Sequence, residues 1–165
     1  MKYLIFILFL FPLISCQSDS ISSLPSGKVV AIADGDTFTL LSKENKQIKI
    51  RLYGIDTPER KQPYGTAARQ YLSELIFGQQ VKYEVLDIDR YQRTIAIVFT
   101  ADKKNVNEEM IKAGYAWHYK QYDQNPEWTR LEQIARKNRS GLWADANPSP
   151  PWEWRKKSRE PAVAE

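Results

Sequence analysis

The stretch QIKIRLYGIDTPE, residues 47–59, decides the fold of this chain, because a strand pattern in it runs directly into a charged turn. Polar and apolar residues alternate over 47–53, as they do in a half-buried β-strand. The segment from Arg51 to Glu59 then places a guanidinium and two carboxylates within about 30 Å of one another, even in a fully extended chain. We therefore expect this strand and turn to be central to both the fold and the functional site.

Further strand patterns lie on both sides of this stretch. An apolar, β-branched run resumes after Asp34-Gly35, and an Asp-Gly pair between such runs is a strong hairpin signal. Two more apolar runs flank the polar segment Asp89 to Arg93. The expected strands occupy the regions 28–53 and 80–100, as the five runs 28–33, 38–41, 47–53, 81–86 and 94–99.

Three helices are expected between and after these strands. Apolar residues at 68, 71, 72, 75 and 76 share one helix face, and Gly78 follows as a stop signal. Asn105 with Glu108 three residues later is a capping-box analogue. Pro126 is a favoured first-turn residue. The expected helices are 66–77, about 105–114 and 126 to about 139, which makes the fold class α+β.

The turns between the strands carry the residues with chemistry. A hard divalent cation prefers carboxylate and carbonyl oxygens, and it can polarise a phosphoryl oxygen and hold a water molecule. Arginine binds phosphate with a two-pronged geometry that lysine cannot copy, and a carboxylate can act as general base. Asp36, Arg51, Asp56, Glu59 and Arg93 supply these groups and indicate metal-assisted attack on a phosphodiester.

Each of these residues also has an ordinary structural interpretation when it is taken alone. Asp34-Gly35 with Asp36 can be a simple hairpin turn, and Arg51 a surface charge on a strand. Glu59 can belong to a strand exit, and Arg93 can merely pair with Asp89 across a turn. The functional interpretation rests on their joint occurrence.

That joint pattern resembles the thermonuclease family, meaning staphylococcal nuclease and its bacterial relatives. The motifs that match in order are Asp34-Gly-Asp-Thr37, the segment from Arg51 to Glu59, Arg93 after an Asp-x-Tyr-x stretch, and the late Ser140-Gly-Leu-Trp143. The resemblance spans about residues 28–143. It implies a five-stranded OB-type β-barrel with three α-helices.

The resemblance also implies a role for each matching residue. The calcium ligands would be Asp36, Asp56 and the carbonyl oxygen of Thr57, and Asp34 would support the site without binding the cation. The catalytic residues would be Glu59 as general base and two phosphate-binding arginines, Arg51 and Arg93.

The chain departs from the family pattern in two places. Gln92 stands where a glycine commonly precedes the second arginine, and a positive φ there would cost a glutamine on the order of 1 kcal/mol. The family also stacks nucleotide bases on tyrosines near the site; Tyr91 fits one of these places, whereas Tyr119 and Tyr122 match the others only loosely. Base stacking tolerates sequence changes, so broad specificity is still expected.

The single histidine gives no alternative catalytic site. His118 has no nucleophile-elbow sequence to serve, and strand or loop packing is the favoured interpretation. With one histidine and one cysteine, the chain also lacks the ligands of an ordinary zinc site.

The first residues indicate export. Lys2 precedes an apolar run too short to cross a membrane, which is typical of a signal peptide over residues 1–15. Ser15-Cys16 resembles the lipobox of bacterial lipoproteins and predicts lipidation of Cys16, followed by a flexible tether over 16–27. An ordinary signal peptide and a secreted soluble product form the alternative.

Composition sets the remaining bounds. At 165 residues the chain suits one domain, placed at 28–144, and a Pro/Trp/basic tail follows at 145–165. The tail's tryptophans either dock on the domain, which is favoured, or meet a partner. Without residues 1–15 the chain has 23 Lys and Arg against 20 Asp and Glu, an excess too small to prove a polyanionic partner.

We therefore expect a calcium-dependent nuclease that is anchored to the bacterial envelope by lipid. The resemblance implies cleavage of the P–O5′ bond of DNA and RNA, preferably single-stranded or frayed, which leaves 3′-phosphates. A monomer without protein partners is expected. The alternatives are a non-catalytic nucleic-acid-binding OB-fold module and a structural envelope lipoprotein, and the second has no need of the Arg51–Glu59 pattern.

Overall fold

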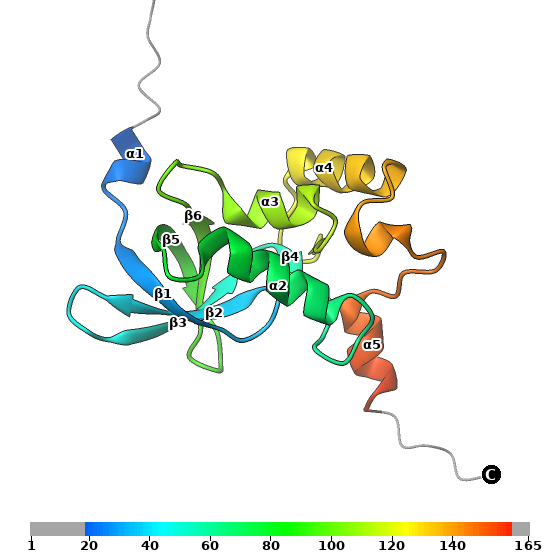
Figure 1. The fold of residues 1–165 in the computed structure, drawn as a ribbon, viewed down its shortest axis with the longest axis horizontal. Coiled ribbons are helices and arrows are strands. Elements are labelled where there is room, and N and C mark those ends of the chain that lie inside the picture. The colour runs from blue at the N-terminus through cyan, green and yellow to red at the C-terminus, as the bar shows by residue number, and fades with distance from the viewer. Residues whose placement is uncertain (1–18, 160–165) are drawn as a thin grey trace, which may run out of the picture.

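A computed structural model describes residues 19–159 and shows a closed five-stranded barrel with helices packed beside it (Figure 1). Around the barrel the strands follow the order β1-β2-β3-β6-β5, and β5 pairs with β1 to close it. The strands are β1 (Ser26–Ile32), β2 (Thr37–Ser42), β3 (Gln47–Leu52), β5 (Gln80–Ile88) and β6 (Thr94–Phe99). The expected α+β class and five-stranded OB-type barrel are confirmed.

The register of the strands brings distant parts of the sequence together. β2 and β3 form an antiparallel hairpin that sets Thr37 opposite Arg51. β3 and β6 run parallel, with Arg51 opposite Ile95. Arg93, which directly precedes β6, therefore begins next to the middle of β3. The barrel thus places Arg51 on β3 and Arg93 directly before the neighbouring strand β6.

The inside of the barrel is filled by apolar side chains from all five strands. Phe38, Leu40 and Ile50 are fully buried there, because alternate residues of a strand point to the same face. Side chains from α2 and α3 extend this core outside the barrel, among them Leu72, Ile76, Met110 and Ile111. One continuous core therefore fixes both the strands and the helices that flank the site.

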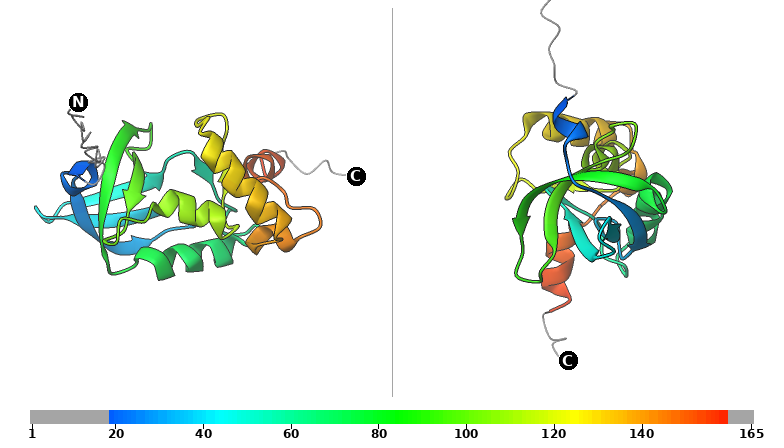
Figure 2. Two further views of the ribbon diagram at one scale, coloured as in Figure 1. Left: turned by 90° about the horizontal axis from the view of Figure 1, so that it is seen from above. Right: turned by 90° about the vertical axis from the view of Figure 1, so that its left-hand side faces the viewer.

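The three helices that were expected cover one side of the barrel and its end (Figure 2). They are α2 (Gly65–Ile76), α3 (Val106–Lys112) and α4 (Pro126–Lys137), close to the expected ranges. Asn105 caps α3 by accepting a hydrogen bond from the Glu108 amide at 3.2 Å. Pro126 stands in the first turn of α4, as its φ preference predicts.

Several short elements were not expected from the sequence. A helix α1 (Asp19–Ser22) lies inside the range assigned to the tether, and β1 begins at Ser26, also within that range. Strands β4 (Ile55–Asp56) and β7 (Trp117–His118) pair outside the barrel. A 3₁₀ helix η1 (Gly141–Ala144) and a helix α5 (Pro151–Lys157) follow α4.

The end of the chain packs on the domain. Trp152 of α5 stacks on Tyr119, with ring centroids 5.0 Å apart and planes at 6°. The favoured interpretation of the tail tryptophans is confirmed for this residue. Together Trp117, Ala135, Leu142 and Trp143 form a second, small cluster of buried residues, and Trp152 packs against it.

The expected signal peptide and Cys16 lie outside the described residues. Within residues 19–159, none of the helices has the length and apolar character needed to span a bilayer.

Candidate active site

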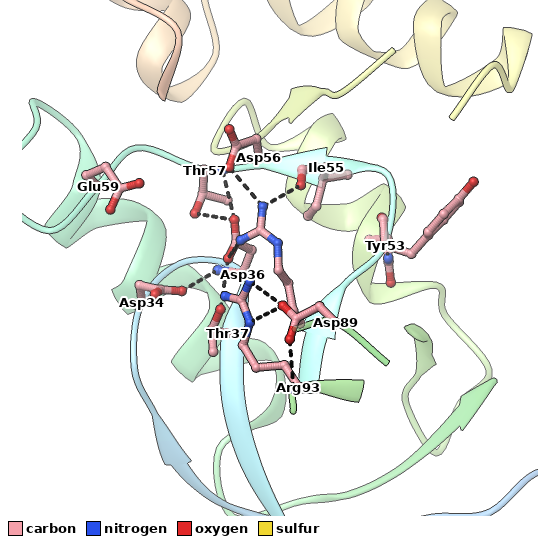
Figure 3. A network of polar contacts seen from close by, with 12 residues as sticks. Asp34, Asp36, Thr37, Tyr53, Ile55, Asp56, Thr57, Glu59, Asp89 and Arg93 are labelled. Atoms are coloured by element: carbon pink, nitrogen blue, oxygen red, sulfur yellow. Dashed lines mark hydrogen bonds and ion pairs between the residues drawn. The ribbon is translucent and has the colours of Figure 1, made fainter. Parts of the chain in front are cut away.

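Arg51 on β3 ties together the two carboxylates that were expected to bind the metal. Its Nη1 lies 2.5 Å from Asp36 Oδ1, and its Nη2 lies 2.9 Å from Asp56 Oδ1. The Nη2 atom also lies 3.4 Å from the Ile55 carbonyl oxygen. Asp36 comes from the turn before β2 and Asp56 from β4, so one guanidinium joins three segments of the chain (Figure 3).

Asp36 is buried, at 3% exposure, and both of its carboxylate oxygens accept hydrogen bonds. Thr37 donates to its Oδ1 at 3.0 Å, while the amide and hydroxyl of Thr57 donate to its Oδ2 at 3.1 and 3.2 Å. The carboxylate of Asp34 accepts from the Asp36 amide at 3.1 Å. Gly35 allows this approach, since a Cβ on it would lie 2.7 Å from Thr57 Oγ1.

Glu59 follows the same turn but stands apart from the aspartates, as Figure 3 shows. Gln62 Oε1 accepts from the Glu59 amide at 3.1 Å, and the Glu59 carbonyl oxygen accepts from the Gln62 amide at 2.8 Å. The side chain of Glu59 is 41% exposed. The turn is therefore rigid at its backbone while the carboxylate remains accessible to a water molecule.

Arg93 does form the pair with Asp89 that its structural interpretation predicted. Its Nε and Nη2 both lie 2.7 Å from Asp89 Oδ2, and Asp89 Oδ1 accepts from the Arg93 amide at 3.0 Å. Gln92 has a φ of 60°, so the position does require the left-handed conformation that favours glycine. The chain accepts this conformation and still presents Arg93 beside β3.

A third arginine, which sequence reasoning missed, also enters the site. Arg155 of α5 contacts Asp56 Oδ2 through Nη2 at 2.7 Å and Asp56 Oδ1 through Nη1 at 3.2 Å. Its Nη1 lies 2.8 Å from Glu59 Oε1 as well. In the sequence Arg155 stands in a Trp-Arg-Lys-Lys tail that lies 96 residues beyond Glu59, and no motif distinguishes it from its basic neighbours.

Burial and mutual repulsion perturb the acidic groups. Burial, together with the charge of Asp36, raises the pKa of Asp34 from 3.8 to about 6. Burial also raises the pKa of Asp56, although Arg155 and Arg51 act in the opposite direction. Burial alone would lower the pKa of Arg51, but Asp36 and Asp56 more than offset it and keep the guanidinium charged.

The oxygen donors of the site suit a hard divalent cation, although the carboxylates alone do not complete its coordination shell. Within residues 19–159, no group of three or more Asp, Glu, His or Cys side chains is arranged to hold a metal ion. The site offers instead two buried aspartates that share one guanidinium. Calcium commonly completes its shell with backbone carbonyls and water, so two carboxylates are a suitable start. Asp36, Asp56 and Thr57 are adjacent, as expected.

The other candidate residues are distributed around this centre. Tyr91 is 63% exposed on the β5–β6 turn, where Arg90 and Arg93 lie over its ring. Tyr119 is covered by Trp152, and Tyr122 packs edge-on against Tyr119. His118 is buried in β7, where its ring nitrogens lie 3.0 Å from Thr129 Oγ1 and 2.8 Å from Asp123 Oδ2. The expected packing role of His118 is consistent with this place.

Comparison with known proteins agrees with this geometry. A family model described as "Staphylococcal nuclease homologue" matches residues 49–145, more than half of the chain. A Haemophilus influenzae protein named an uncharacterized endonuclease is 45% identical over 132 residues, covering 80% of this chain and 74% of its own. An Escherichia coli O157:H7 protein of the same name is 42% identical over 129 residues, covering 78% and 84%.

A plant relative matches over a smaller part of its length. A probable staphylococcal-like nuclease of Oryza sativa subsp. japonica is 39% identical over 132 residues, which are 80% of this chain and 34% of that protein. The segment that the family model matches contains the turn from Arg51 to Glu59 as well as Arg93. On these grounds the chain belongs to the staphylococcal nuclease family.

Proposed function

We propose that this protein is a calcium-dependent nuclease that hydrolyses phosphodiester bonds of DNA and RNA. The observation that carries the proposal is the junction at Arg51, where one guanidinium holds Asp36 and Asp56 side by side, close to the turn after Asp56 that bears Glu59. Oxygen ligands, a candidate base and phosphate-binding cations then lie within one small region. Nuclease names among the relatives agree with it.

Each residue has a distinct task in this proposal. Asp36, Asp56 and the Thr57 carbonyl oxygen would hold calcium, which supplies a positive charge beside the scissile phosphate. Glu59 accepts the proton of the attacking water. Arg51 and Arg93 neutralise the charge that develops on the phosphoryl oxygens, and Asp34 orients Asp36 through its amide. Water attack with loss of the 5′ oxygen would leave a 3′-phosphate.

Broad substrate use follows from where the aromatic residues lie. Tyr91 is exposed beside Arg93, and an aromatic ring binds any base by stacking. Single-stranded or frayed DNA and RNA present such unstacked bases, so we propose them as preferred substrates of a monomeric enzyme.

The decisive experiment compares the unchanged protein with Glu59→Gln on single-stranded DNA, duplex DNA and RNA. With calcium, Glu59→Gln should lower kcat by at least about 100-fold, because it removes the general base, which typically contributes that much. Binding of an oligonucleotide, measured with a chelator present so that it is not cleaved, should change little. Glu84→Gln, an exposed change on β5, serves as the matched control.

Two results would contradict the proposal. Full activity of Glu59→Gln would remove Glu59 from its role. Tight binding of the oligonucleotide by the unchanged protein, without any calcium-dependent cleavage, would favour the non-catalytic binding module instead.

We also propose that Cys16 anchors the protein to the bacterial envelope, on the grounds of Ser15-Cys16 after a short apolar run. A tethered enzyme would act on nucleic acids at the envelope. Mass spectrometry of the membrane fraction should find an acylated Cys16 as the mature amino terminus. A soluble product with an unmodified cysteine would instead support the secreted alternative.

A further inference from the structure

Helix α5 is fixed against the domain at its beginning. Trp152 stacks on Tyr119 and meets Trp117 edge-on, with centroids 5.6 Å apart. Just before the helix, the Ser149 carbonyl oxygen accepts a hydrogen bond from Gln62 Nε2 at 2.6 Å, and Pro151 is buried. The first turn of α5 therefore has a defined position next to the turn that bears Glu59.

This position aims Arg155 at the candidate active site. Arg155 stands three residues after Trp152, so both side chains lie on the same face of the helix. Its guanidinium forms a two-pronged pair with Asp56 and reaches Glu59 with the same Nη1 atom. Within residues 19–159, Arg155 is the one cation with an ion pair to Glu59.

The contacts of Arg155 use the atoms that the chemistry requires. Asp56 Oδ1 already accepts from Arg51, and Arg155 adds a second donor there and takes Oδ2 as well. A cation that approached Asp56 would have to displace one of these donors. The Oε1 atom of Glu59 is engaged too, so a water molecule that approaches this atom has to compete with Arg155.

We propose that α5 competes with calcium within the molecule. The guanidinium of Arg155 occupies the carboxylate of Asp56, and calcium must displace it before catalysis. The inference rests on the proposed function, because it takes Asp56 as a calcium ligand and Glu59 as the base. If only the molecules with α5 undocked bind calcium, the apparent affinity is the affinity of the open form multiplied by the fraction of open molecules. Docking of about nine molecules in ten would weaken calcium binding about tenfold.

The test measures calcium binding without nucleic acid, by titration calorimetry with calcium chloride on the full chain. Arg155→Gln should lower the dissociation constant for calcium at least about threefold, because the competing guanidinium is gone. Lys156→Gln removes an equal charge from an exposed position of the same helix and should change it less than twofold. Thermal melts verify that both variants are folded.

A second variant separates docking from charge. Trp152→Ala keeps every charge of the chain but removes the ring that stacks on Tyr119. If docking of α5 is what opposes calcium, Trp152→Ala should also tighten calcium binding. If Arg155→Gln binds calcium more tightly but Trp152→Ala does not, the effect is only charge repulsion between Arg155 and calcium, and the proposal is overturned.

The remaining outcomes are equally distinct. If Arg155→Gln binds calcium as tightly as the unchanged protein or less tightly, or if Lys156→Gln gains as much as Arg155→Gln, the proposal that Arg155 competes with calcium is overturned. Calcium-dependent cleavage by the unchanged protein would then leave the nuclease proposal intact. Absence of calcium binding in all four proteins, together with absence of cleavage, overturns the proposed function and this inference with it.

Discussion

At the scale of single residues, Gly65 governs where Glu59 stands. A Cβ on Gly65 would lie 2.0 Å from the Glu59 carbonyl oxygen and 2.8 Å from its carbonyl carbon, so backbone would have to move. We predict that Gly65→Ala displaces the Glu59 turn and lowers kcat at least about tenfold, as small misplacements of catalytic groups do. Nuclease assays well below the melting temperature would measure this loss.

Gly78→Ala is the matched control for that change. Gly78 has a φ of 76°, and a Cβ there would meet nothing within 4 Å. The change should cost about 1 kcal/mol of stability through backbone strain while kcat stays unchanged. Equal loss of activity in both variants would show that lowered stability, and not the place of Glu59, causes the effect.

The candidate site itself could be predicted largely from the sequence, because most of it comes from one local turn. Asp56, Thr57 and Glu59 are fixed close to one another by chain connectivity, and the hairpin at Asp34-Gly35 adds Asp36. Arg155 could not be predicted, because its contact depends on how a distant helix packs. Local sequence patterns do not predict a contact between two segments that lie far apart in the chain.

At the scale of elements, the longer segments were predictable for physical reasons. The apolar face of α2 includes the buried Ala68, Leu72 and Ile76, which is the periodicity that predicted the helix. The side chain of Asn105 caps α3, and Pro126 begins α4. Where local preference and tertiary packing agree, the ranges differ from expectation by only a few residues.

The shorter elements depend on tertiary context. β4 and β7 contain two residues each, and they exist because Ile55 pairs with His118 and Asp56 with Trp117 across the chain. Helix α5 has seven residues, too few to be stable alone, and the contacts of Trp152 hold it. Sequence patterns of this length resemble loops, which is why no helix was expected in the tail at 145–165.

At the scale of the whole molecule, closure of the barrel is the feature that local patterns could not give. Closure requires β1 to pair with β5, at Gly27 opposite Val81, and β3 to run parallel with β6. These pairings join strands separated by α2, so the resemblance to a known family was needed to expect them. Closure also matters for the site, since the β3–β6 pairing brings Arg51 near Arg93.

The closed fold holds its carboxylates at a cost in stability, and calcium should reduce that cost. Burial raises the pKa of Asp34 to about 6 and also raises the pKa of Asp56, so the ionised carboxylates destabilise the folded protein. For Asp34 this cost grows as the pH rises above 3.8 and is complete above about pH 6. A cation that binds only the folded state adds about 2.7 kcal/mol to the free energy of unfolding at 100 times its dissociation constant. We predict a calcium-dependent rise of the melting temperature at pH 8, which a chelator reverses.

Asp36→Asn should abolish most of this rise, because it removes a charged ligand from the proposed calcium site while the amide oxygen can still accept from Thr57. The variant is less stable without calcium, since it weakens the pair with Arg51, so the comparison is the calcium-induced shift within each protein. Asp102→Asn, at an exposed carboxylate far along the chain, should keep the full shift. An equal shift in Asp36→Asn would place the stabilising cation elsewhere on the molecule and would separate the acidic turn from calcium altogether.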